Sequence, residues 1–311
     1  MTRTRIAGAV LLSPLLFGSL TVAQEQLPRI AYDVKESVVK VEIHLIETGD
    51  HERVSDQLKA CFRESDYCVI GTGVLVNDDG DVLTAAHVAR DTTAVSQALK
   101  DIAIDSEVMI AGQARSAEYI KGGVRNGNGA FRAAIKVIDA GHDVAVLGHD
   151  SNSLRQEPSA IDDESMVHRQ GSRAARLAAQ RPDVAEAVFA FGFPSYSPAL
   201  ITTAGSIVLA AGSKNLVEAK KSGDTQLVPI YRAKLDISPG NSGSPLFRAS
   251  DGALLGIVSE IGDEREPVAT IIPATEIAKV LGANGIKWNA APLRQASGSN
   301  SKSRRKKAKT E

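Results

Sequence analysis

The sequence predicts an all-β protein, a barrel or a sandwich, and two observations lead to this expectation. Short runs of β-branched and other apolar residues recur along most of the chain, separated by Gly, Asp and Pro. Many short strands at regular spacing are typical of these two architectures. The chain has 311 residues, 43% hydrophobic and 23% charged, so it can bury a substantial core in one or two domains.

Each predicted strand is justified by its alternation or by the turns that bound it. Residues 37–46 alternate branched and polar side chains, as a half-buried strand does. Residues 67–89 predict a hairpin, because an acidic Asp-Gly turn separates two apolar runs. That turn, Asn77 to Asp81, lacks the glutamate that would complete a calcium loop, so we expect no metal there. Further strands are expected within 131–147, 187–194, 201–210, 227–237, 244–247, 253–261 and 267–273.

Helices are predicted in only three places, residues 93–103, 172–180 and 274–285. The last begins after Pro273, with Thr275 as its N-cap, and ends near Gly282. Beyond the last helix, residues 289–311 are rich in Ser, Lys and Arg and show no apolar period, which predicts a disordered basic tail.

The N-terminal residues 1–23 have the pattern of a secretory signal peptide. Two arginines precede an apolar run of 15 residues ending at Leu20, whereas a membrane span needs roughly 20 residues. Thr21 and Ala23 are small residues placed for a cut before Gln24, and an uncleaved anchor is the alternative. We therefore expect an exported protein, periplasmic or secreted, with no transmembrane span after cleavage.

Export bears on the two cysteines, Cys61 and Cys68, which could form a disulfide in an oxidising compartment. A pair of free thiols is the alternative. No Cys/His cluster accompanies them, so neither a metal site nor another cofactor is expected.

Charge is distributed unevenly along the chain. The formal net charge is −1, but residues 300–311 hold six of the 36 Lys and Arg, which leaves a body of 30 basic and 36 acidic residues. An acidic body is not expected to bind nucleic acid. The basic tail could attract anionic surfaces in a salt-dependent way, and a solvated tail without a partner is the alternative.

The run Gly-Asn-Ser-Gly at residues 240–243 is either the bend of a hairpin or the loop of a nucleophile, Ser242. Serine becomes a nucleophile at neutral pH only when a base takes its proton. His87 follows the apolar run Val82 to Ala86, and Asp143 enters the apolar run Val144 to Leu147. A carboxylate that enters a core needs a partner, and His87 would be that partner. Together the three residue types form a Ser-His-Asp triad, in which the carboxylate orients the imidazole.

These segments resemble a known family. "LTAAHV" with His87, "HDVAVL" with Asp143 and "PGNSGSPLF" with Ser242 are similar to chymotrypsin-fold serine peptidases, in the same chain order. "GTGVLVNDDGDVLTAAHV", "VFAFGFP", "GALLGIVSEI" and "TIIPATEIAKVL" resemble the HtrA/Deg-type protease domain.

The resemblance implies two six-stranded antiparallel β-barrels, at about residues 30–150 and 186–273, within a protease domain that spans 24–288. It places the triad in the cleft between them and an oxyanion hole at Gly240, Asn241 and Ser242. It also implies that Ser259 lines the cleft and bonds Asp143, with a plain strand serine as the alternative.

Two departures accompany the resemblance. Ser244 stands where most members carry a second glycine, and "GNSGSP" looks instead like the variant found in bacterial glutamyl endopeptidases. We expect no PDZ domain, because few residues follow the last predicted helix. Specificity is open: Asp236 precedes the nucleophile at the spacing of the trypsin-type acid, whereas Ile261 would narrow the same pocket.

The sequence therefore predicts an exported serine endopeptidase acting on proteins or peptides. The alternatives are a catalytically silent binding protein with the same fold, and a protein held at the envelope or another anionic surface by its tail.

Overall fold

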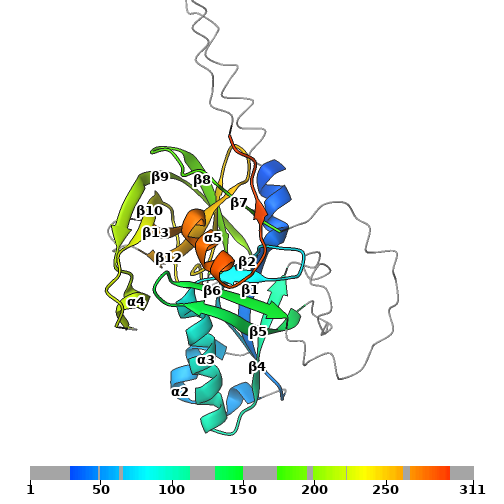
Figure 1. The fold of residues 1–311 in the computed structure, drawn as a ribbon. Coiled ribbons are helices and arrows are strands. Elements are labelled where there is room, and N and C mark those ends of the chain that lie inside the picture. The colour runs from blue at the N-terminus through cyan, green and yellow to red at the C-terminus, as the bar shows by residue number, and fades with distance from the viewer. Residues whose placement is uncertain are drawn as a thin grey trace, which may run out of the picture.

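The structure is a computed structural model that describes residues 29–47, 50–62, 66–112, 130–149, 174–194, 199–221, 223–261 and 267–294. The predicted signal segment, residues 1–23, and the charged end of the tail lie outside these ranges. Two closed antiparallel barrels dominate the fold, one above the other in Figure 1, and confirm the predicted fold class.

The first barrel closes in the order β1-β2-β3-β6-β5-β4. Its interior holds branched and small apolar residues from alternate strand positions, among them Val39, Val41 and Leu147. This alternation is the period-2 pattern of the sequence. The strands are β1 (Val38–Leu45), β2 (Tyr67–Leu75), β3 (Val82–Thr84), β4 (Ser106–Gly112), β5 (Ala130–Asp139) and β6 (Val144–His149).

The second barrel closes through the pairing of β11 with β12, in the order β11-β8-β9-β10-β13-β12. Three phenylalanines, Phe189, Phe191 and Phe247, pack together at its centre with ring centroids 5.6 to 6.4 Å apart. Two short strands, β7 and β14, extend this sheet in parallel from β12. The strands are β7 (Arg176–Leu177), β8 (Ala187–Gly192), β9 (Ile201–Lys214), β10 (Val228–Lys234), β11 (Pro245–Arg248), β12 (Leu254–Ile261), β13 (Val268–Pro273) and β14 (Asn289–Ala290).

The helices differ from the sequence-based expectation in several places. Helix α3 (Ala86–Asp101) begins seven residues before the predicted start and so includes His87, which was expected at the end of a strand. The segment predicted as a helix at 172–180 is extended where it is described, because Arg176–Leu177 pair with β12 and β14. Sheet pairing outweighs the helix propensity of its alanines. The structure also contains short helical elements that the sequence analysis did not predict: residues 29–34, η2 (Lys35–Ser37), η3 (Asp50–Glu52), α2 (Asp56–Phe62) and α4 (Val217–Lys221).

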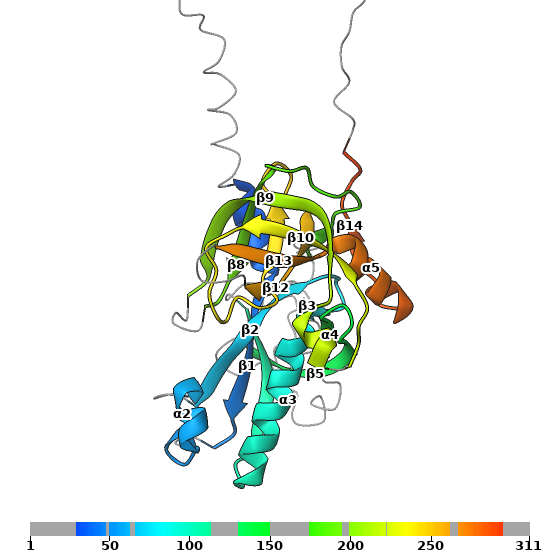
Figure 2. The same ribbon diagram turned by 90° about the vertical axis from the view of Figure 1, so that its left-hand side faces the viewer.

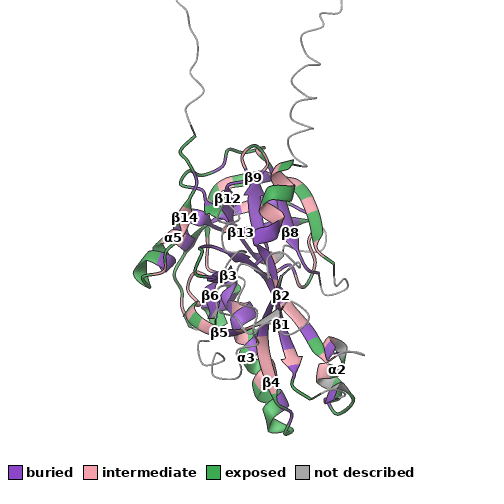
Figure 3. Ribbon diagram, turned by 90° about the vertical axis from the view of Figure 1, so that its right-hand side faces the viewer, coloured by how far each residue is buried: buried purple, intermediate pink, exposed green. Residues whose placement is uncertain are grey.

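Helix α5 (Ala274–Ala283) confirms the predicted C-terminal helix, but its N-cap is Pro273 rather than Thr275. The prediction that the tail begins at residue 289 is wrong at its start, because Asn289–Ala290 form β14. Buried residues run through the strands of both barrels, whereas much of β9 and the far end of α3 are exposed (Figure 3).

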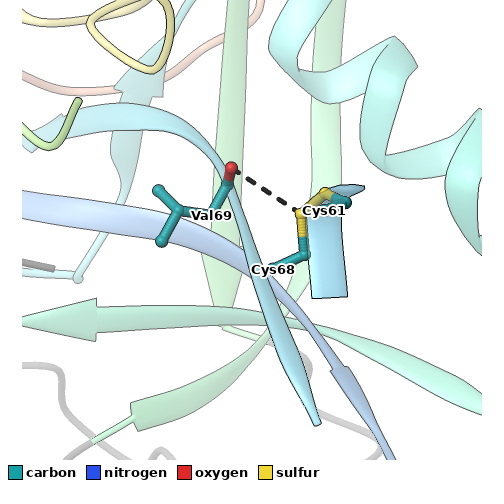
Figure 4. Close-up of a disulfide and its surroundings, with 3 residues drawn as sticks. All are labelled: Cys61, Cys68 and Val69. Carbon is teal, nitrogen blue, oxygen red and sulfur yellow. Dashed lines mark hydrogen bonds between the residues drawn. A yellow bond between two sulfur atoms is a disulfide. The ribbon is translucent and has the colours of Figure 1, made fainter. Parts of the chain in front are cut away.

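A separate small core lies at the far end of the first barrel, where β1 and β2 extend beyond it between α2 and α3 (Figure 2). Ile43, Phe62, Leu99 and Ile104 are fully or almost fully buried there. A disulfide joins Cys61 on α2 to Cys68 on β2, with Cα atoms 5.3 Å apart. Figure 4 shows the bridge, with the Cys68 sulfur 3.8 Å from the carbonyl oxygen of Val69.

Candidate active site

His87 lies in the first turn of α3, where the backbone N–H groups of a helix have no partner within the helix. The N-cap residue is Ala85, whose methyl side chain cannot accept a hydrogen bond from these N–H groups. The carboxylate of Asp143 takes this role from another element: its Oδ1 accepts the backbone N–H of His87 at 3.1 Å. Asp143 therefore caps the helix that carries His87.

The same carboxylate holds the imidazole. His87 Nδ1 lies 3.1 Å from both oxygens of Asp143. The Ser259 hydroxyl donates to Asp143 Oδ2 at 2.5 Å, which is the contact that the family resemblance implied. Asp143 is 1% exposed and sits between β5 and β6 with φ of +52°, a conformation that aspartate tolerates better than most residues. The hydrogen bonds from His87 and Ser259 satisfy this carboxylate, as a buried polar group requires.

The pKa of His87 is raised above its ordinary value. Burial of the ring lowers this pKa, but the hydrogen bond and the negative charge of Asp143 raise it by more. The charges of Asp91 and Glu218 add to the increase. Asp91 lies one turn further along α3, and burial raises the pKa of its own carboxyl. Asp143 thus makes the His87 ring a stronger proton acceptor. It contacts the ring through Nδ1, so Nε2 is the nitrogen that can take a proton from another group.

The loop at residues 239–243 presents two backbone N–H groups that have no acceptor among the residues that the structure describes. The N–H of Asn241 bonds the carbonyl of Ser238 at 3.0 Å, and the N–H of Gly243 bonds that of Val258 at 2.8 Å. Across the described part of the chain, the N–H groups of Gly240 and Ser242 have no hydrogen-bond acceptor. Gly240 has φ of +93°, which glycine adopts readily. Free donors at alternate residues, i and i+2, are an arrangement that can bind an anionic oxygen.

The loop packs against the first barrel directly beside the start of α3. The carbonyl of Ser242 accepts the N–H of Thr72 on β2 at 2.9 Å. Gly243, with φ of +81°, has no room for a Cβ, because that atom would overlap the Thr72 carbonyl and the Thr84 hydroxyl. Its Cβ position is 3.1 Å from the backbone nitrogen of Ala85, two residues before His87. The second barrel's Ser242 loop and the first barrel's His87 helix therefore meet at one seam.

A glycine on β8 accommodates the same loop. A Cβ on Gly192 would overlap the side-chain oxygens of Asn241 and Ser244. Both residues are buried, at 7% and 1% exposure. The residue that departs from the common glycine pattern, Ser244, is thus enclosed behind the loop by a glycine of a neighbouring strand.

Asp236 and Ile261, the two residues predicted to set specificity, lie at or near the ends of strands in the second barrel. Asp236 follows β10 and is exposed, and its backbone carbonyl accepts the Thr203 hydroxyl at 3.0 Å. An acid at the base of a specificity pocket would be enclosed, so this exposure does not favour the trypsin-type role. Ile261 ends β12 opposite Ala269 of β13.

Other polar candidates are accounted for by local partners. His44 bonds Glu42 on the same strand at 2.9 Å, and His142, in the turn after β5, bonds Asp139 at the end of β5 at 3.1 Å. Within the described ranges, no group of three or more His, Cys, Asp or Glu is placed to hold a metal ion, and no helix is long and apolar enough to cross a membrane.

Sequence reasoning missed two residues of the site, Thr72 and Gly192. Both lie in segments that carry the family resemblance, "GTGVLV" and "VFAFGFP", but nothing in the local pattern says that they meet the loop of Ser242. Their contacts span 168 residues for Thr72 and Gly240, a distance that no local signal covers.

Comparisons with known proteins agree with this architecture. A sequence profile described as a trypsin-like peptidase domain matches residues 71–257. The Rv3671c protease of M. tuberculosis, in its active form, is 19% identical with a TM-score of 0.51, over 94% of this chain and 95% of that one. The HtrA-type protease AlgW, solved with a decapeptide, is 18% identical with a TM-score of 0.54, over 83% of this chain and 67% of that one. No curated protein matches the chain significantly.

The double barrel and the matched domain define a serine-type endopeptidase, a hydrolase of peptide bonds. The chain belongs to the trypsin-like peptidase domain family, whose profile covers more than half of it.

Proposed function

We propose that Ser242, His87 and Asp143 form the catalytic triad of this peptidase, acting through an acyl-enzyme. The Ser242 hydroxyl oxygen attacks the carbonyl carbon of the scissile peptide bond while His87 Nε2 takes its proton. The C–N bond then breaks, and the leaving amine receives that proton from His87. A water molecule hydrolyses the resulting ester by the same route, which regenerates the free serine.

The oxyanion of each tetrahedral intermediate would be bound by the N–H groups of Gly240 and Ser242, with Asn241 holding the loop between them. A single donor of this kind contributes roughly 3 kcal/mol to transition-state stabilisation. Ser259 would support the triad by donating to Asp143. The substrate would be a protein or a peptide.

One observation carries the proposal: Asp143 holds both the ring and the backbone of His87, at the seam where the loop of Ser242 packs on Ala85. Asp143 is almost fully buried and accepts from the His87 backbone, the His87 ring and Ser259, which supports the fixed ring orientation that a general base needs.

Labelling with a fluorophosphonate probe, read by intact mass and peptide mapping, tests the triad. The unsubstituted protein should gain one adduct at Ser242, and Ser242→Ala should gain none and lose at least about 10³-fold in kcat. Ser242→Ala should keep its thermal midpoint, because one hydroxyl contributes little stability. A folded native protein that does not react, beside a trypsin control that does, would favour the silent binding protein.

Export is part of the proposal, with residues 24–288 as the mature protease domain in a periplasm or outside the cell. The disulfide between Cys61 and Cys68 supports an oxidising compartment. N-terminal sequencing of the protein recovered from an exporting host should begin at Gln24. A retained Met1 in the mature protein would argue for an anchor instead.

For specificity, we propose that small aliphatic side chains are preferred before the cut and that Asp236 is not the pocket acid. Cleavage of a peptide library tests this. A clear preference for Lys or Arg, abolished by Asp236→Asn, would assign the pocket to Asp236.

A further inference from the structure

We propose that Thr72 is a positioning residue for the oxyanion hole: its hydroxyl fixes the peptide between Gly240 and Asn241 and thereby aims the N–H of Gly240. The inference rests on the proposed function and adds a residue from the opposite barrel to the machinery.

The contacts of Thr72 are specific. Its hydroxyl donates to the carbonyl of Gly240 at 3.0 Å and accepts the N–H of Phe193 at 3.0 Å. A hydroxyl has one proton, and the bond from Phe193 uses a lone pair, so that proton is directed to Gly240. Thr72 also donates its own N–H to the carbonyl of Ser242 at 2.9 Å and is completely buried.

These bonds help to fix two peptides of the loop. The peptide between Gly240 and Asn241 is held at both ends, its carbonyl by Thr72 and its N–H by Ser238. The peptide between Ser242 and Gly243 is also held at both ends, by Thr72 and Val258. The N–H groups of Gly240 and Ser242, which have no acceptor within the described ranges, lie on either side of the peptide between Gly240 and Asn241.

The direction of the Gly240 N–H depends on the anchored peptide. Glycine at φ of +93° meets little steric resistance to rotation, so its conformation must be set by its hydrogen bonds. Without the Thr72 hydroxyl, the Gly240 carbonyl loses its only partner among the described residues and the peptide is held at one end. The N–H of Gly240 would then lose its alignment with the oxyanion, while the residues that bind substrate stay in place.

The test compares Thr72→Val, which keeps the shape but lacks the hydroxyl, with Thr72→Ser, which keeps the hydroxyl. In Thr72→Val we expect kcat on a peptide substrate to fall by about 10- to 100-fold, with KM changed by less than about twofold. Affinity for a peptide boronate, a transition-state analogue, should fall in parallel with kcat. Thr72→Ser should recover kcat to within about threefold of the unsubstituted protein.

Thr92→Val is the matched control, because Thr92 is also fully buried and donates one hydrogen bond, to the carbonyl of Ala89 at 2.6 Å. It should lower the thermal midpoint without lowering kcat. Unchanged kcat in folded Thr72→Val, a change confined to KM, or failure of Thr72→Ser to restore kcat would each overturn the role of Thr72. A loss of kcat in Thr92→Val as large as that in Thr72→Val would also overturn it. Absence of hydrolysis and of probe labelling in the unsubstituted protein would instead refute the proposed function, and the role of Thr72 with it.

Discussion

A single carboxylate, that of Asp143, serves two groups of His87 that are chemically unrelated. It accepts the backbone N–H at the helix start and holds the ring nitrogen, both at 3.1 Å. Its second oxygen, Oδ2, accepts the Ser259 hydroxyl. The state of the imidazole is therefore coupled to the order of the first turn of α3.

The raised pKa of His87 predicts the acid side of the pH profile. Because the unprotonated ring is the base in the proposed mechanism, kcat/KM should rise with pH through a midpoint above about 6.5, the ordinary value for histidine. Since the charge of Asp91 helps to raise this pKa, Asp91→Asn should move the midpoint to lower pH. Initial rates from pH 5 to 9 measure both effects.

Asp101→Asn is the control, since Asp101 lies at the other end of the same helix. An equal displacement of the midpoint in both variants would contradict the assignment to Asp91.

The contribution of His87 to the stability of the fold changes with pH in the opposite direction to activity. The pKa of His87 is higher in the folded than in the unfolded state, so its contribution is complete below pH of about 6.5 and is lost as pH rises through the folded value.

At the scale of elements, the start of α3 illustrates the limit of local signals. Ala85 and Ala86 give no capping signal, and the acceptor that begins the helix lies 56 residues away in the chain. Asp143→Ala should remove the cap and lower the free energy of unfolding by about 1 to 3 kcal/mol.

Asp143→Asn should recover much of this stability, because the amide oxygen can still accept the His87 N–H, but it should not recover activity. Urea denaturation and amide exchange at residues 86–90 measure the cap. Equal stability of the Ala and Asn variants would contradict the capping role.

The disulfide secures a second element-level feature, the small core beneath the first barrel. It joins α2 to β2 across a sequence separation of 7. Closing so short a loop contributes about 2 kcal/mol by the chain-entropy estimate, so the double variant Cys61→Ala, Cys68→Ala should unfold at lower urea concentration. Its kcat/KM should change by less than about twofold, because this core lies apart from the triad. A large loss of kcat in the folded variant would show coupling to the site.

At the scale of the whole molecule, the C-terminal segment 286–294 contacts both barrels and forms a strap between them. Asn77 in the first barrel's turn donates to the carbonyl of Lys287 at 2.9 Å, and the N–H of Asn289 bonds Val76 at 3.3 Å. Strand β14 then pairs with β7 of the second barrel, and Arg294 bonds Glu186 at 2.8 Å. The turn Asn77 to Asp81 thus anchors this strap.

Removing the strap should loosen the barrel pair. Truncation after Gly285 should lower the thermal midpoint by about 5 to 10 °C, because several hydrogen bonds of about 1 kcal/mol are lost. Truncation after Arg294 is the matched control, since it leaves the strap complete and should not change the midpoint. Differential scanning fluorimetry distinguishes them, and equal midpoints for both truncations would show that the strap carries no stability.

Most strands were predictable because their apolar residues follow a local, period-2 pattern, as Val39, Val41 and Ile43 do in β1. Strand β4 was not predicted, and Glu42 of β1 is buried although it lies between apolar residues. The start of α3 beside His87 was not predictable, because the carboxylate that caps it lies on a distant loop. The strand at Arg176–Leu177 was not predictable either, because pairing with β12 and β14 holds these residues in an extended conformation. Tertiary contacts outweigh propensities of a few tenths of a kcal/mol per residue.

The amino-acid sequence shows the class of architecture and the residue types that could catalyse acyl transfer, because strand periodicity and a serine flanked by glycines are patterns of neighbouring residues. The tertiary structure alone decided that Asp143 caps the helix of His87 and that Thr72 holds the peptide beside Ser242. Hydrogen bonds join whichever groups the closed barrels bring within about 3 Å, and no spacing along the chain specifies that approach.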